Sequence, residues 1–327
     1  MAIYLFFGEE SYLLDTKVKK MKREFGNLIN GINFIQIDDS NVKEIISDIE
    51  TPAFGYEKKL IIAKNTGLFK KEKKTAKGPE LENIKQANKV AEYINENVDL
   101  INAAVELIFV EEVVEKNELY KAIEKNGTIT EFAILKLPEL VQNIQKICAA
   151  YKVKIDSSTA KYFIECCGTN MQDLINEVRK LIEFVGADGI ITNKEIDLLC
   201  IKQIDSVIFD LTDNLGKRDI EKAMQVLKEL IYEKEPIQKI LITLYNHFKK
   251  LYIVKIAEKY RKDLAVSMKL KPNQMFLVNK YKMQARYFTE KEIRQILQEL
   301  INLDANYKIG LIDINVGLEA ILCRYCS

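Results

Sequence analysis

Residues 3–13 read IYLFFGEESYL, an apolar strand pattern followed directly by a turn and the start of a helix. A short apolar run that ends at a glycine is typical of a strand buried on both faces of a sheet. Four more such runs occur before residue 137, at 33–37, 60–63, 106–110 and 128–132. Helical patterns lie between them, at 11–25, 41–50, 80–95 and 116–125. This alternation predicts an α/β domain with a parallel sheet and flanking helices.

From Pro138 onward the strand patterns end and the sequence becomes helical. Asp156 and Asn170 are residue types that cap helix N-termini, and Thr192 with Glu195 has the form of a capping box. The chain has 327 residues, more than the roughly 250–300 at which a single hydrophobic core stops growing. The sequence therefore predicts three domains: an α/β domain at 1–137, a small helical domain at 138–205 and a second helical domain at 206–327.

The N-terminal residues and the hydropathy of the chain indicate the cellular compartment that we expect for it. No apolar run approaches the roughly 18 residues that a membrane-spanning helix needs. The N-terminus lacks the basic region of a signal peptide and reaches the acidic pair Glu9 and Glu10 at once. These features predict a cytoplasmic protein with no membrane partner.

Positive charge is concentrated near the end of the chain, although the net charge of the whole is only +1. Residues 249–294 hold 13 Lys and Arg against 4 Asp and Glu. Such a segment fits contact with a phosphate backbone, and it fits a solvated helical face equally well. The candidate DNA-proximal side chains are Lys249, Lys250, Lys280, Lys282 and Arg286. A second basic stretch, 70–79, ends in Gly-Pro and predicts a surface loop.

The turn after the first strand lacks the chemistry of a nucleotide site. A phosphate-binding loop needs several glycines, a lysine for the outer phosphates and a hydroxyl group for magnesium. Here there is one glycine, Gly8, no lysine, and two carboxylates that would repel a triphosphate. Glu111 follows the fourth strand, where P-loop ATPases place a magnesium-holding acid, but no lysine loop accompanies it. The sequence therefore predicts no ATP site and no cofactor.

No other catalytic or metal-binding pattern stands out. His247 is the one histidine and is predicted to be a packing residue in a helix. Cys323 and Cys326 have metal-type spacing, but no second pair follows them, so a zinc site is not expected. The adjacent Cys166 and Cys167 lie in an apolar helical pattern and are predicted to be small buried hydrophobes. We expect no catalytic residues and no metal ion.

Five segments together resemble the delta subunit of the bacterial clamp loader, a part of DNA polymerase III. They cover nearly the whole chain in the family's order: YLFFGEESYLL at 4–14, TPAFGYEKKL at 51–60, DSSTA at 156–160 with GTNMQDL at 168–174, IFDLTD at 208–213, and LDANYKIG at 303–310.

The resemblance implies an AAA+-like α/β domain, a small helical lid domain and a helical collar domain that joins the subunit to its partners. It implies a non-catalytic subunit of the DNA-directed DNA polymerase holoenzyme, which binds the beta sliding clamp and opens its ring without hydrolysing ATP. The implied partners are that clamp, the tau/gamma ATPase subunits, delta-prime and, through backbone contacts, primer-template DNA.

The family grips the clamp with a hydrophobic tip, which by position matches Ala53 and Phe54, preceded by Pro52. Here Ala53 stands where a leucine commonly precedes the phenylalanine, and Phe54 could instead pack into the core of its own domain. The pair Leu68 and Phe69 is the second choice of anchor. Lys58 and Lys59 are candidates for a polar rim around the tip, or for simple solvation.

Two other classes of function remain open at this point. One is an AAA+-family ATPase, which the missing lysine loop disfavours. The other is an α/β enzyme with a helical cap, for which the sequence offers no catalytic constellation. A replication-associated interaction scaffold is the alternative if clamp binding fails.

Overall fold

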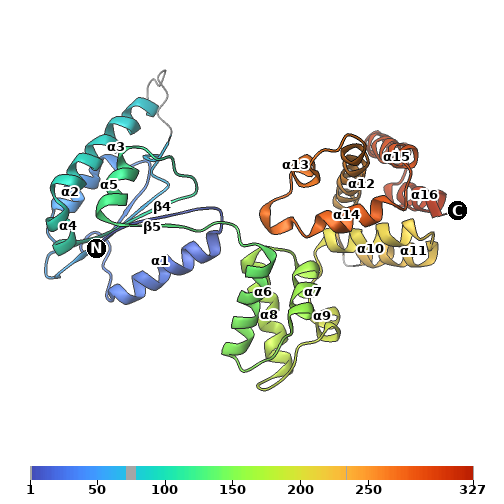
Figure 1. Ribbon diagram of the computed structural model, residues 1–327, viewed down its shortest axis with the longest axis horizontal. Coiled ribbons are helices and arrows are strands. Elements are labelled where there is room, and N and C mark those ends of the chain that lie inside the picture. The colour runs from blue at the N-terminus through green and yellow to red at the C-terminus, as the bar shows by residue number, and fades with distance from the viewer. Residues whose placement is uncertain (1, 71–78, 233, 327) are drawn as a thin grey trace. The chain divides into compact units, whose positions relative to one another are not determined.

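The computed structural model describes residues 2–70, 79–232 and 234–326 (Figure 1). Residues 71–78, most of the predicted basic loop, lie outside this part. The chain divides into two compact units, Met1–Ile134 and Leu135–Ser327. The three-domain division with borders after residues 137 and 205 stays a prediction.

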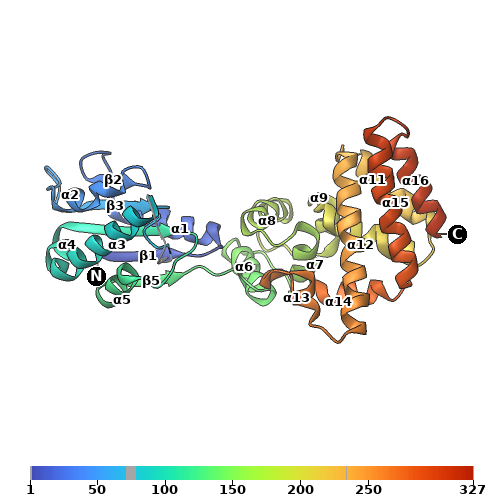
Figure 2. The ribbon, with the colours of Figure 1, turned by 90° about the horizontal axis from the view of Figure 1, so that it is seen from above.

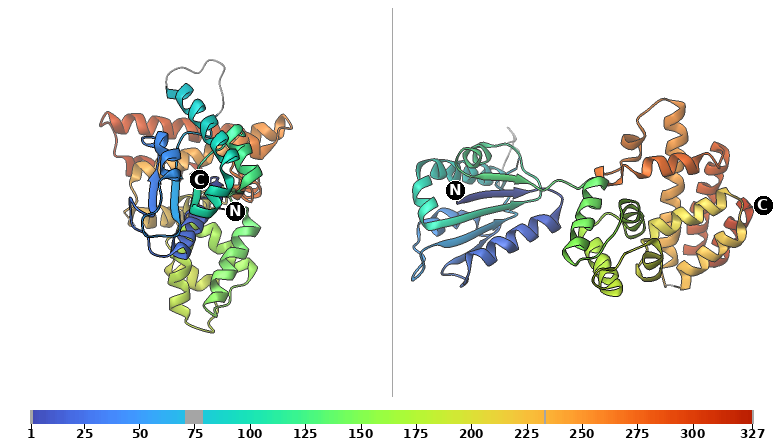
Figure 3. Two further views of the ribbon diagram at one scale, coloured as in Figure 1. Left: turned by 90° about the vertical axis from the view of Figure 1, so that its left-hand side faces the viewer. Right: turned by 60° about the horizontal axis from the view of Figure 1, so that its bottom comes forward.

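The first unit holds a five-stranded sheet. Its strands are β1 Ile3–Phe7, β2 Phe34–Ile37, β3 Lys59–Lys64, β4 Val105–Glu111 and β5 Thr128–Glu131. All pairings are parallel, and the strand order is β2-β3-β4-β1-β5 (Figure 3). The five strands expected from the apolar runs are confirmed, with borders within one residue.

Helices cover both faces of the sheet, as continuous apolar strands require. The helical elements of this unit are α1 Ser11–Phe25, η1 Val42–Glu44, α2 Ile45–Glu50, α3 Pro79–Glu96, α4 Val98–Ala104 and α5 Glu118–Asn126. Helix α1 covers one face and α2, α3, α4 and α5 cover the other (Figure 1). Leu60 and Ile62 of β3 pack on the α1 face, whereas Ile61 and Ala63 pack on the opposite face. The predicted fold class is confirmed for this unit. Helix α4 was not predicted.

The second unit begins with four helices: α6 Leu137–Ala150, α7 Ser157–Cys167, α8 Met171–Val185 and α9 Asn193–Leu199. Asp156 caps α7 by accepting from the amides of Ser158 and Thr159 at 2.7 and 2.9 Å. Asn170 caps α8 in the same way, and Thr192 with Glu195 forms a capping box at α9. The three predicted helix starts are confirmed, because capping depends on residues only a few positions apart.

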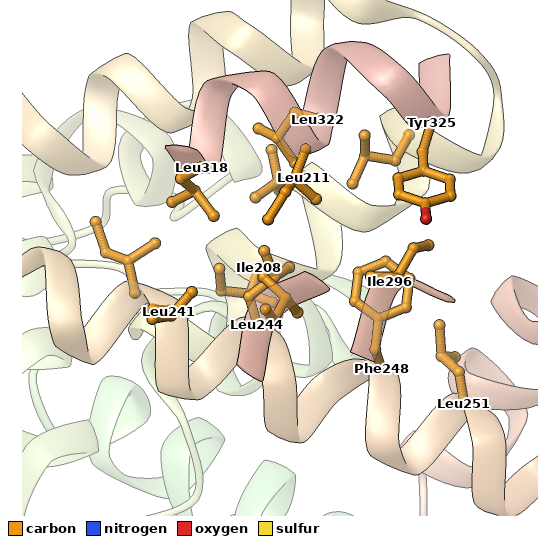
Figure 4. Close-up of a cluster of buried hydrophobic side chains, with 14 of the residues drawn as sticks. Ile208, Leu211, Leu241, Leu244, Phe248, Leu251, Ile296, Leu318, Leu322 and Tyr325 are labelled. Atoms are coloured by element: carbon orange, nitrogen blue, oxygen red, sulfur yellow. The ribbon is translucent and has the colours of Figure 1, made fainter. Parts of the chain in front are cut away.

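The remaining elements are also helical. They are α10 Ile204–Gly216, α11 Ile220–Tyr232, α12 Ile237–Lys259, α13 Leu264–Met268, η2 Pro272–Gln274, α14 Leu277–Ala285, α15 Glu290–Lys308 and α16 Ile314–Cys326. The long helix α12 runs beside α15 (Figure 2). Leu244 and Phe248 of α12 meet Leu211 of α10, Ile296 of α15 and Leu322 of α16 in one apolar core (Figure 4). This core confirms that the chain ends in a helical bundle.

His247 lies inside this bundle, as predicted for a packing residue, and is 4% exposed. Its Nε2 is 2.8 Å from Oε1 of Gln284, whose Nε2 donates to the carbonyl oxygen of Phe209 at 2.8 Å. The ring also packs edge-on against Phe209, with centroids 4.5 Å apart. Burial lowers the pKa of His247 from its ordinary value of 6.5 to about 3, so the folded chain holds it neutral.

This histidine makes the stability of the chain fall in mild acid. Its folded pKa lies below its unfolded pKa, so its contribution is full above 6.5 and is lost as the pH falls toward 3. Between about pH 7.5 and about pH 5.5 we expect the free energy of unfolding to drop by about 1.4 kcal/mol more in the wild type than in His247→Gln. Urea unfolding at the two pH values measures this, and equal drops in both proteins would contradict it.

Candidate functional site

The loop that joins α2 to β3 presents one large apolar side chain to solvent. Phe54 is 85% exposed, Pro52 is exposed and Ala53 is half-buried. The amide of Tyr56 donates to the carbonyl oxygen of Ala53 at 3.0 Å and closes a tight turn. Gly55 has a φ of 78°, which a glycine adopts at little cost. The turn therefore points Phe54 away from its own domain, and the alternative that it packs in the core is wrong.

The base of this loop is fixed by a buried lysine. Lys59 is 2% exposed, and its Nζ donates to the carbonyl oxygens of Asp48 and Thr51 at 2.7 and 2.5 Å. These carbonyls lie at the C-terminal end of α2, where a helix favours positive charge. Burial lowers the pKa of Lys59, and the nearby Asp48 carboxylate counteracts this shift. Lys58 is exposed, as a rim residue or a solvated lysine would be. Lys59 is buried, so both interpretations of it, polar rim and simple solvation, are wrong.

The second-choice anchor lies in the core of the sheet unit. Leu68 and Phe69 are each 2% exposed. The ring of Phe69 packs edge-on against Phe109 of β4, with centroids 5.5 Å apart. The carbonyl oxygen of Leu68 accepts from Nδ2 of Asn117 at 2.7 Å. A partner could reach this pair only if the core opened.

The turn after β1 is closed by backbone hydrogen bonds. The amide of Gly8 donates to the carbonyl oxygen of Glu111 at 3.3 Å, and that of Glu10 donates to the carbonyl oxygen of Phe132 at 3.0 Å. Gly8 has a φ of 130°, and an added Cβ would collide with the backbone of Phe132. Two amide groups of the turn thus donate to backbone carbonyl oxygens of the same chain. A phosphate-binding loop instead directs its amides at the ligand.

Glu111, in the position of a magnesium-holding acid, has a structural role. It is 7% exposed, and its Oε1 accepts from the amide and the hydroxyl of Thr66 at 2.9 and 2.7 Å. Burial raises the pKa of Glu111, while the hydrogen bonds from Thr66 oppose that shift. The carboxylate therefore fastens the segment after β3 to the end of β4.

The five predicted DNA-proximal side chains differ in their surroundings. Lys280 pairs with Glu165 at 2.6 Å, and Lys282 lies 3.8 Å from Glu258. Lys250 donates to the hydroxyl of Tyr281 at 3.2 Å. Two of the five are exposed: Lys249 and Arg286. These two are the members of the set whose charges are most open to a phosphate backbone.

The cysteines show one association that the sequence did not indicate. Cys166 and Cys167 are buried, as predicted. Yet Cys167 lies with Glu177 and Cys200 in a cluster whose thiol and carboxylate atoms are all within 4.8 Å of one another. The three residues are far apart in sequence and match no spacing motif. Cys323 is exposed, and the side chain of Cys326 lies outside the described residues.

Among the described residues, no helix is both long enough and apolar enough to cross a membrane.

Two family models match the chain. One, described as "DNA polymerase III, delta subunit", matches residues 4–133. The other, described as "DNA polymerase III delta subunit, C-terminal domain", matches residues 205–325. Together they span most of the chain, including the Phe54 loop and the helical bundle.

Curated relatives and a solved structure agree with these models. DNA polymerase III subunit delta of Bacillus subtilis (strain 168) is 24% identical over 338 residues, covering 98% of this chain and 92% of the relative. The probable DNA polymerase III subunit delta of Aquifex aeolicus (strain VF5) is 26% identical over 317 residues, covering 94% and 86%. The solved Bacillus subtilis DNA clamp loader delta protein superposes with a TM-score of 0.74 at 22% identity, over 100% of this chain and 95% of the other. This superposition shows that the two chains share a fold.

Proposed function

The chain belongs to the DNA polymerase III delta subunit family, and from this premise we propose that it binds the beta sliding clamp through Phe54 and opens the ring for loading onto primed DNA. The observation that carries the proposal is an aromatic side chain, 85% exposed, on a loop whose base is held by buried Lys59. Aromatic anchors that fill a partner's pocket often dominate the energy of an interface. A preformed loop adds little ordering cost when the anchor binds.

Opening the ring requires no chemistry from this chain. If the Phe54 loop binds the open clamp more tightly than the closed clamp, the equilibrium shifts by that difference in affinity. ATP bound by the tau/gamma subunits then controls whether the loop is presented. In this proposal residues 1–137 bind the clamp, 138–205 form the lid, and 206–327 form the collar that joins tau/gamma and delta-prime in the cytoplasm.

Clamp opening can be measured directly. A pair of dyes placed across one clamp interface quench each other in the closed ring, and opening restores their fluorescence. The wild-type chain is expected to restore fluorescence without nucleotide. If it binds the clamp and leaves the dyes quenched, the opening part of the proposal is wrong.

We expect this chain to neither bind nor hydrolyse ATP. The amides of Gly8 and Glu10 are used by backbone carbonyls, and the turn carries no lysine for the outer phosphates. Titration of the purified chain with a fluorescent ATP analogue and magnesium is expected to give no saturable signal, and phosphate release should equal the buffer blank. Saturable binding, or phosphate release above that blank, would favour the AAA+ ATPase alternative.

Lys249 and Arg286 are proposed to contact the primer-template backbone. In the assembled loader, log affinity falls as log salt rises, and the double variant Lys249→Ala/Arg286→Ala is expected to make this negative slope shallower by roughly 1 for each phosphate that it no longer neutralises. Fluorescence anisotropy with labelled primer-template DNA measures this slope. Lys194→Ala, at an exposed lysine of α9, is the matched control and should leave the slope unchanged. An unchanged slope in the double variant would assign these charges to a solvated face.

A further inference from the structure

We propose that Cys167, Glu177 and Cys200 form a binding site for a thiophilic divalent cation of the zinc type. Their donor atoms, two sulfurs and a carboxylate oxygen, all lie within 4.8 Å of one another. Ligand atoms around a tetrahedral zinc ion are roughly 3.3–3.8 Å apart, given metal–ligand distances of about 2.0–2.3 Å. The three donors therefore need to move only about 1 Å to surround one ion.

The three donors come from three different helices or their ends. Cys167 is the last residue of α7, Glu177 lies in the middle of α8, and Cys200 directly follows α9. These helices pack against one another in the small bundle, so their backbones already hold the donors at one point. Such a preformed arrangement removes much of the ordering cost of metal binding.

The carboxylate is oriented by its neighbours in a way that suits a ligand. Oε2 of Glu177 accepts from the amide of Ile201 at 3.1 Å and pairs with Nζ of Lys180 at 2.7 Å. Both interactions use the same oxygen, Oε2, and they hold the carboxylate in place beside the two thiols. Hydrogen bonds of this kind fix the direction of metal-binding carboxylates.

A path from solvent reaches the cluster. Cys167 and Glu177 line a surface cavity of about 490 Å³, which Asp173, one helical turn before Glu177, also lines. A water molecule, or the Asp173 carboxylate, would complete four-fold coordination. Two sulfurs and a carboxylate favour zinc-type ions over magnesium or calcium, which prefer oxygen ligands. As each sulfur–metal bond forms, the thiol releases its proton to solvent, and no oxidant or reductant is required.

A bound cation would fix the segment that leads into the collar. Cys200 and Ile201 lie just before Gln203, whose amide donates to the carbonyl oxygen of Cys166 at 2.8 Å. Helix α10 begins at Ile204. The ion would thus link α7, α8 and the 200–203 segment to one another. This proposal revises the expectation of no metal, which rested on spacing along the sequence, and it stands independently of clamp binding.

The test uses the full chain, reduced and freed of metal with a chelator, and titrated with Co²⁺. A sulfur-to-cobalt charge-transfer band is expected, and Zn²⁺ should remove it by displacing the cobalt. Cys200→Ser and Glu177→Gln each remove a proposed ligand, so each is expected to weaken cobalt binding by more than the roughly 10- to 100-fold that loss of an outer-shell partner costs. The double variant Cys323→Ser/Cys326→Ser removes the cysteine pair with metal-type spacing in the sequence, and it should keep the band.

Because Cys167 is buried, Cys167→Ser could fail to fold, so an alkylation experiment on the wild type supports the variants. Zn²⁺ is expected to protect the partly exposed Cys200 from a thiol reagent, as read by peptide mass spectrometry, and to leave the exposed Cys323 reactive. The proposal is overturned if the wild type gives no cobalt band, or if the band survives Cys200→Ser and disappears in the Cys323/Cys326 variant. It is also overturned if Cys167 and Cys200 prove to be joined in a disulfide in place of binding metal.

Discussion

Phe54→Ala is expected to weaken binding of this chain to the sliding clamp by at least about 30-fold, which corresponds to about 2 kcal/mol. The physical reason is the exposure of the ring. Phe54 is 85% exposed in the free chain, so its apolar surface is removed from water only when a partner covers it. Surface plasmon resonance with immobilised clamp measures the change, and most of it should appear in the dissociation rate.

The matched control is Val113→Ala. Val113 is 72% exposed in the same unit and follows β4, whereas the Phe54 loop precedes β3. Because β3 and β4 are parallel neighbours, the loop before β3 and the residues after β4 lie at opposite ends of the strands. The control should bind the clamp like the wild type. Equal affinities of Phe54→Ala and wild type would remove Phe54 as the anchor.

Phe69→Ala is expected to lower the free energy of unfolding of the sheet unit by about 3–5 kcal/mol. Phe69 is 2% exposed and packs edge-on against Phe109, so truncation leaves a cavity and removes the packing of one ring on the other. Urea unfolding followed by circular dichroism measures the decrease. Phe54→Ala makes the same chemical change on the surface, where substitutions usually stay within about 0.5 kcal/mol.

These two phenylalanine variants separate the two candidate anchors. Phe54→Ala should bind the clamp more weakly and keep the free energy of unfolding of the wild type. The main effect of Phe69→Ala should be a lower free energy of unfolding. If Phe69→Ala unfolds like the wild type and binds the clamp weakly, then Leu68 and Phe69 are the anchor and Phe54 is not.

The strands and helix starts were predictable because their signals are local. An apolar run such as 3–7 is readable over five residues, and the caps Asp156, Asn170 and Thr192 act on amides two or three positions away. Helix α4 was missed because it has only 7 residues and its N-cap, Asn97, makes no side-chain capping hydrogen bond. A short helix without a cap is held by packing against the rest of the unit, which a local pattern does not encode.

The clamp-binding role of the candidate site stays a prediction, and its geometry could not be predicted from the sequence. The resemblance placed the tip at 53–54, yet only the folded loop shows that Phe54 faces solvent while Phe69 is buried. Lys59 looked like a surface lysine because its acceptors, the carbonyls of Asp48 and Thr51, come together only when α2 ends beside β3. The cluster of Cys167 with Cys200 was hidden for the same reason, since it depends on the packing of three helices.

The most direct test of the central claim is whether the wild-type chain binds the sliding clamp of its own organism in the absence of nucleotide. Analytical ultracentrifugation or interferometry with the purified proteins measures this without other loader subunits. Saturable binding is expected, because Phe54 is exposed and the base of its loop is fixed in the free chain. Absence of binding would contradict the clamp-opening function and leave the interaction scaffold as the remaining alternative.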